Sequence, residues 1–137
     1  MNMKKTIALL SLLIVTLGAS AVRAREHHGG EHHVKADLVP NGDSGVSGFV
    51  QLVQMPHGGT NVHVIAKGLR PGTVYSSFYY ESSNCTEPAD PLGTFTANAG
   101  GVGVVHGKID DDLDEVGSVS VRLGPGYGEL QACAKVH

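Results

Sequence analysis

The 137-residue chain has no tryptophan, and its apolar runs are short. The longest, at 6–17, covers about 12 residues, whereas a membrane-spanning helix needs roughly 20. We therefore expect no transmembrane anchor. The chain also lacks a Gly-x-Ser-x-Gly nucleophile motif, a Cys/His nucleophile pair and a phosphate-binding loop, which leaves enzymatic activity with little support.

The first 24 residues are typical of a cleavable signal peptide. Lys4 and Lys5 precede the apolar run, and small residues follow it, which is the usual order of a charged start, a short apolar core and a cleavage site. We expect cleavage after Ala24, with Ala21 as the alternative. The protein is then secreted or periplasmic, with no membrane span left after cleavage.

Positive charge is scarce in the remainder of the chain. Lys4, Lys5 and Arg23 leave with the signal peptide, so seven of the ten basic residues remain beside all 13 acidic ones, and the net charge is near −6. Nucleic acids and anionic membrane surfaces both attract basic patches. We therefore expect neither of them as a partner.

The chain has only two cysteines, Cys85 and Cys133. In an oxidising compartment such a pair predicts a structural disulfide. Closing a loop of this length is worth roughly 4 kcal/mol in the chain-entropy model. The alternative is a reactive thiol pair, but reactive pairs are usually close together in sequence.

The 19 glycines and the short alternating segments predict an all-β domain. We divide the chain into a signal peptide (1–24), a flexible histidine-rich arm (25–33) and one β domain (34–137). About eight short strands separated by turn residues are typical of a β-sandwich or barrel. The expected strands are 34–39, 46–55, 62–67, 74–80, 92–96, 102–109, 118–123 and 130–136.

Three motifs carry a resemblance to a known family. They are Gly-Leu-Arg-Pro-Gly at 68–72, Leu-Gly-Thr-Phe-Thr-Ala at 92–97 continuing to Gly-Gly-Val at 100–102, and Ala-Cys-Ala-Lys-Val at 132–136. In this order, and with Cys85 and Cys133 placed as they are, the chain resembles the copper/zinc superoxide dismutases. The resemblance implies an immunoglobulin-like Greek-key β-sandwich of the dismutase type.

The metal ligands of that family do not carry over. Ser77 and Tyr79 stand where the resemblance implies two copper-binding histidines, and Leu123 lies near the expected late copper ligand. The segment 86–91, in place of the zinc loop, has no histidine, and Leu130 replaces the substrate-guiding arginine. We therefore expect an exported non-catalytic domain that binds a protein or metal partner or has a structural role.

The strongest local candidate for a site is the histidine-rich arm, with His27, His28, His32 and His33. Imidazoles on a flexible segment can chelate copper, zinc or nickel without a preformed scaffold. The alternative function is therefore periplasmic copper or zinc binding or metal delivery through the arm. A solvated low-complexity leader is the simpler interpretation of the same residues.

The other histidines in the middle of the chain are scattered over a turn and two expected strands. Between Val62 and Val64, His63 is expected to point away from these two residues toward solvent. A folded site made of His57, His63 and His106 is the less favoured possibility, and we do not assign His106 as a ligand.

Three further features give weaker evidence of a functional site than the histidines do. The acidic run at 110–115 lacks the spacing of a calcium loop, which favours a solvated loop. A rebuilt enzyme site near Tyr75, Ser77 and Tyr79 is the second alternative function, although packing of these tyrosines is the simpler expectation. Asn84 lies in an Asn-x-Thr glycosylation sequon.

Overall fold

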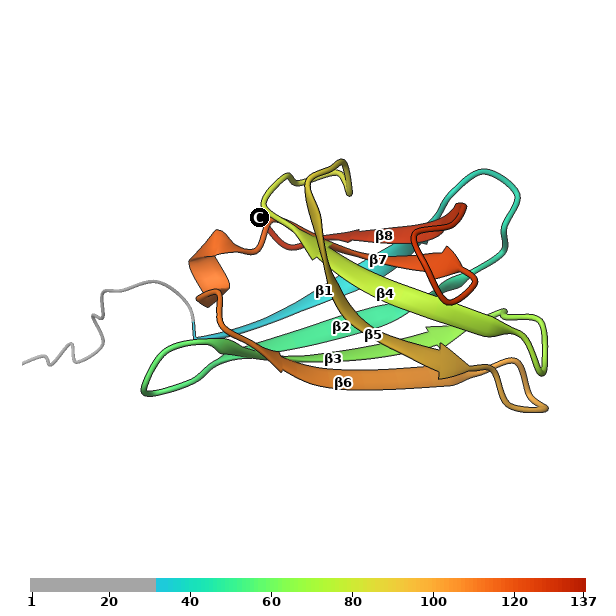
Figure 1. Cartoon of the computed structure of the whole chain (residues 1–137), viewed down its shortest axis with the longest axis horizontal. Helices are drawn as coiled ribbons and strands as arrows, with labels where there is room; N and C mark the ends of the chain where they lie inside the picture. Colours follow the sequence, from blue (N-terminus) through green and yellow to red (C-terminus); the bar gives the residue numbers. More distant parts are fainter. Residues whose placement is uncertain (1–31) are drawn as a thin grey trace, which may run out of the picture.

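Residues 32–137 are described by a computed structural model, in which eight antiparallel strands form one nearly closed sheet (Figure 1). This confirms the expected all-β class and the number of strands. None of the helical structure among these residues is long and apolar enough to span a membrane. The elements are β1 (His33–Pro40), β2 (Ser47–Gln54), β3 (Thr60–Lys67), β4 (Val74–Tyr80), β5 (Ala89–Thr96), β6 (Gly103–Ile109), the 3₁₀ turn η1 (Leu113–Glu115), β7 (Ser118–Leu123) and β8 (Leu130–Lys135).

The strand order is β5-β4-β7-β8-β1-β2-β3-β6. The two end strands, β5 and β6, lie against each other without pairing, and this contact nearly closes the sheet (Figure 1). Glycines permit the close approach. A Cβ on Gly93, Gly103 or Gly107 would overlap a side chain of the opposite strand.

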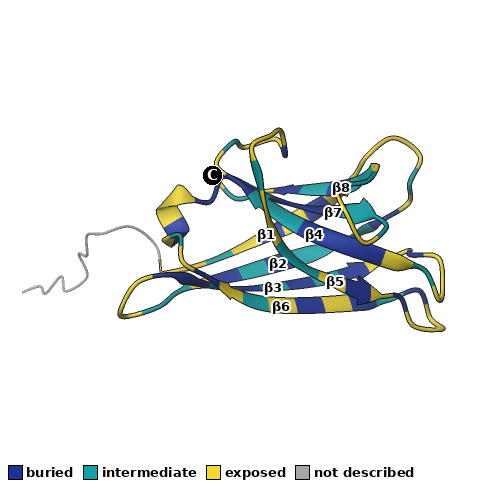
Figure 2. Ribbon diagram, viewed as in Figure 1, coloured by how far each residue is buried: buried dark blue, intermediate teal, exposed yellow. Residues whose placement is uncertain are grey.

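The alternation of buried and outward residues along β3 and β6 explains why they form strands. Val62, Val64 and Ala66 on β3 are fully buried, whereas the residues between them point outward. On β6 the same alternation is visible in the colouring by burial (Figure 2). Because successive strand residues point to opposite faces, the buried set on each strand fills the space inside the sheet.

Only β4 and β7 have the bounds expected from the sequence at both ends, and the largest difference is in β5. β5 begins at Ala89 and therefore includes Pro91, whereas the sequence suggested a start at Leu92. Proline cannot donate a ladder hydrogen bond, but it is tolerated in β5 because this strand is at the end of the strand order. At the start of the described residues, β1 begins at His33, one residue before the start expected from the sequence.

The outer face of β4, β7 and β8 is covered by residues 81–88 and 124–129. Ser76 Oγ donates to Gly126 O at 2.6 Å, and Ser118 Oγ donates to Ser82 O at 2.6 Å. The serines and Tyr80 on this face are buried although they point away from the core. Hydrogen bonds from Ser76 and Ser118 to the covering segments, and one between the Tyr80 hydroxyl and Ser120 Oγ at 2.7 Å, compensate for the loss of water.

The disulfide fixes one of these covering segments. Cys85 lies in residues 81–88, and it is bonded to Cys133, which points outward between buried Ala132 and Ala134 of β8. The predicted Cys85–Cys133 bridge is therefore confirmed. It ties a loop to the outside of the sheet rather than crossing the core.

Closure of the sheet at β5 and β6 yields a stability prediction. Gly103→Ala places a methyl group against the Phe95 ring, which is stacked on Tyr75 with ring centroids 6.0 Å apart and cannot move freely. We expect a loss of about 1–3 kcal/mol in the free energy of unfolding, measured by urea denaturation.

Gly126→Ala is the matched control, because a Cβ at Gly126 meets nothing within 4 Å. This variant should stay within about 0.5 kcal/mol of the unchanged protein. Equal unfolding midpoints for the two variants would contradict the tight contact between β5 and β6.

Candidate functional site

The outward residues of β1, β2, β3 and β6 form a second outer face, which we call the open face. Strand pairing aligns these residues in rows that run across the four strands. Several side chains on it are exposed, including Val53 at 40% and Val104 at 50%. Its three rows are His33–Val53–Asn61–Lys108, Lys35–Gln51–His63–His106 and Asp37–Phe49–Ile65–Val104.

The middle row contains a pair of histidines on adjacent strands. His63 of β3 is directly opposite His106 of β6, and the ring centroids are 5.5 Å apart with the planes at 74°. His106 is exposed and His63 half-buried. The sequence predicted that His63 points outward, but it gave no means of placing His106 beside it. Only the pairing and register of the two strands reveal the pair, and His57 stays apart in the exposed turn between β2 and β3.

The four histidines assigned to the arm are only partly within the described residues. His27 and His28 lie outside them. His33 is the first residue of β1 and is exposed on the open face. His32 is also exposed, and its carbonyl oxygen accepts a hydrogen bond from Gln54 N at 2.9 Å. The pairing of β1 with β2 thus fixes the end of the histidine-rich segment on the sheet.

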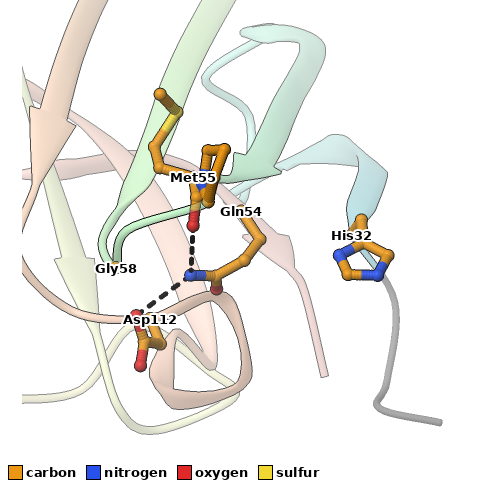
Figure 3. Close-up of a pocket in the computed structure, with 6 residues that line it drawn as sticks. His32, Gln54, Met55, Gly58 and Asp112 are labelled. Atoms are coloured by element: carbon orange, nitrogen blue, oxygen red, sulfur yellow. Dashed lines mark hydrogen bonds between the residues drawn. The ribbon is translucent and has the colours of Figure 1, made fainter. Parts of the chain in front are cut away.

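His32 lies at an open pocket of about 630 Å³ at one end of the sheet (Figure 3). Gln54 Nε2 donates to Asp112 Oδ1 at 3.0 Å, and Gln54 Oε1 accepts from Leu113 N at 2.7 Å. The amide of Gln54 therefore binds η1 to the end of β2. These hydrogen bonds stabilise the wall of the pocket. The lining residues are His32, Gln54, Met55, Pro56, Gly58 and Asp112.

The acidic run beside this pocket forms a small carboxylate cluster. Carboxylate oxygens of Asp112, Asp114 and Glu115 lie within 4.8 Å of one another, and all three residues are exposed. Glu115 accepts a hydrogen bond from Asp112 N at 2.8 Å, and buried Leu113 anchors the turn. An exposed acidic turn of this kind is common in proteins that bind no ion.

The pKa values of two neighbouring carboxyl groups in this run are shifted in opposite directions. Hydrogen bonds from Gly59 N and the Gln54 side chain hold the pKa of Asp112 below its usual value. Partial burial raises the pKa of Asp111, and the negative charge of Glu115 adds to that shift. The different partners of the two groups explain the contrast.

The residues proposed for a rebuilt enzyme site face the interior. Tyr75 is 3% exposed, and its hydroxyl accepts a hydrogen bond from Arg70 N at 2.9 Å. Ser77 is fully buried and donates to Ser120 O at 2.8 Å. Burial, followed by the nearby charge of Asp111, raises the pKa of Tyr79 to about 12. The three hydroxyls do not converge on a common partner in these contacts.

Comparison with known proteins assigns no family to this chain. No family model matches its sequence, and no curated protein matches it. The resemblance to copper/zinc superoxide dismutases therefore rests on the three sequence motifs, and membership of that family stays a prediction.

The lowered pKa of Asp112 predicts part of the pH dependence of stability. A carboxylate with a depressed pKa in the folded state stabilises the protein above its unfolded pKa of about 3.9, and this contribution is lost as the pH falls through the folded value. The unchanged protein should therefore be more stable than Asp112→Asn at neutral pH. This difference should shrink below about pH 4, as measured by urea unfolding across the pH range.

Asp114→Asn is the matched control because it removes an exposed carboxylate from the same turn without touching Gly59 or Gln54. Asp111 is present in all three proteins, so its opposite contribution cancels in the comparison. Identical pH profiles for Asp112→Asn and Asp114→Asn would contradict the role given to these hydrogen bonds.

Proposed function

We propose that this chain is an exported, non-catalytic protein that binds a transition-metal ion through His27, His28, His32 and His33. The observation that carries the proposal is the placement of His32 and His33. Both side chains are exposed where the segment joins the sheet, and the pairing of β1 with β2 fixes that point. The end of the histidine-rich segment is thus held at a defined position, with the side chains of His32 and His33 exposed.

The chemistry of these side chains favours copper, zinc or nickel. Neutral imidazole is a good ligand for all three ions, and the affinity for a given site is highest for Cu²⁺. Four histidines within seven positions offer enough donors for one ion.

The absence of catalysis is supported by the surroundings of Ser77 and Tyr79. The resemblance places copper ligands at these positions, yet here one is fully buried and the other packs against the core. A metal-dependent enzyme needs oriented ligands and an open coordination position. Sequestration or delivery of an ion needs neither of these.

Export and the finer fold type belong to the same proposal. The signal-like residues 1–24 and the Cys85–Cys133 bridge both support a secreted or periplasmic location. The dismutase-type Greek-key sandwich is supported by the strand order, because the β3–β4 and β6–β7 connections join strands that are not neighbours.

Binding of a partner protein is the second candidate function. The exposed Val53 and Val104 and the half-buried Phe49 and Ile65 give the open face an apolar part. Apolar residues that gather on one face are a common feature of protein interaction sites.

The proposal is tested by replacing the four histidines at 27, 28, 32 and 33 with glutamine in the processed protein. We expect the variant to bind at least one equivalent of Cu²⁺ less than the unchanged protein, because its strongest chelating donors are gone. Elemental analysis after dialysis measures the difference, on protein purified without an affinity tag.

His57→Gln is the control, since it removes one exposed imidazole from the turn between β2 and β3. Equal copper content in the four-histidine variant and the unchanged protein would overturn the metal-binding role. Superoxide dismutation by the copper-loaded protein would overturn its non-catalytic character.

A further inference from the structure

We infer that His63 and His106 form a second metal site, separate from the N-terminal histidines, for a divalent transition-metal ion such as zinc or copper. The two residues face each other across paired strands on the open face. The site uses no residue of the N-terminal segment. This inference can therefore be tested separately from the function proposed above.

The distance between the rings suits one shared ion. A zinc–nitrogen bond of about 2.0–2.1 Å places the ion about 3.1 Å from each imidazole centre, so a tetrahedral ion holds two ring centres about 5 Å apart. The observed separation of the His63 and His106 ring centroids is 5.5 Å. In the proposed complex, the two side chains turn from their edge-to-face arrangement so that one nitrogen of each ring is directed at the same ion.

The backbone already supplies the required proximity. Directly opposed residues of antiparallel strands have Cβ atoms about 4.5–5.5 Å apart, and the pairing of β3 with β6 extends from Thr60 to Ala66. His63 and His106 lie in the middle of this ladder rather than at a frayed end. Little backbone conformational entropy is therefore lost when an ion joins the two rings.

Both imidazoles are available to an ion. Within residues 32–137, neither ring takes part in a hydrogen bond or an ion pair. Each ring instead makes an edge-to-face contact with the other. His106 is exposed, so an ion can reach the pair directly from solvent. Binding then breaks no existing polar contact of either side chain.

Two lysines in the rows of the open face, Lys35 and Lys108, have partners or neighbours away from the histidine pair. Lys35 Nζ lies 4.4 Å from the centre of the Phe49 ring, and Lys108 Nζ lies beside Gly59 at the turn between β2 and β3. Gln51, which is opposite His63 on β2, is uncharged. The negative charge of the chain also favours the approach of a cation.

Two protein ligands leave part of the coordination shell open. A tetrahedral ion held by His63 and His106 has two further positions, which water or a ligand from another molecule can occupy. Structural zinc sites instead use four protein ligands. The pair is thus suited to an ion that is exchanged, and not to one that is locked into the fold.

The test uses the processed protein in which His27, His28, His32 and His33 are glutamine, so that only the histidines of the folded body remain. We expect this protein to bind one equivalent of Zn²⁺ in a calorimetric titration. His106→Gln in this background should weaken binding at least about tenfold, and His63→Gln should do the same, because each removes one of two ligands. His57→Gln is the matched control and should leave the affinity unchanged.

Histidine-ring NMR on the same background protein gives a result that does not depend on a folded variant. Added Zn²⁺ should shift the ring signals of His63 and His106 together and leave those of His57 and His137 in place. No bound zinc, or zinc binding that survives both substitutions, would overturn the inference. Neither result bears on the N-terminal histidines, whose contribution is measured by comparison with the unsubstituted protein.

Discussion

The pairing of β3 with β6 determines both what fills the interior of this protein and what faces away from it. Val62, Val64 and Ala66 are buried, so the residue between the two valines must point outward. This residue is His63, and the same ladder places His106 of β6 directly opposite it. A slip of one residue on either strand would turn a histidine into the core and an apolar side chain into water. Burial of the apolar set thus maintains the histidine pair on the surface.

The two outer faces of the sheet serve different purposes. On β4, β7 and β8, outward serines and Tyr80 are covered by loops, and Cys85–Cys133 holds one loop in place. The polar side chains on this side form hydrogen bonds within the protein. The open face has no such covering from the disulfide-linked loop, and it carries His33 together with the opposed histidines. In our proposal, the covered face contributes to stability and the open face carries the histidines that bind metal.

Local patterns in the sequence predicted the all-β class and the number of strands, because alternation and turn residues act over a few positions. The disulfide was predicted from the presence of only two cysteines in a chain with an export signal. The start of β5 was predicted too late because proline is unusual inside a strand. Pro91 is tolerated only because β5 is at one end of the strand order, which the sequence does not reveal. The position of His106 beside His63 depends on long-range register, which no local pattern contains. The resemblance to superoxide dismutases indicated positions where the metal ligands expected from it are absent, but it offered no guide to the histidine pair on β3 and β6.

The most direct measurement is anomalous diffraction at the zinc edge from crystals of the processed protein grown with Zn²⁺. The account predicts an anomalous peak between His63 and His106, with one nitrogen of each ring at about 2.0–2.1 Å from the ion. A zinc peak confined to the carboxylates of Asp112, Asp114 and Glu115, with none between the two imidazoles, would contradict it.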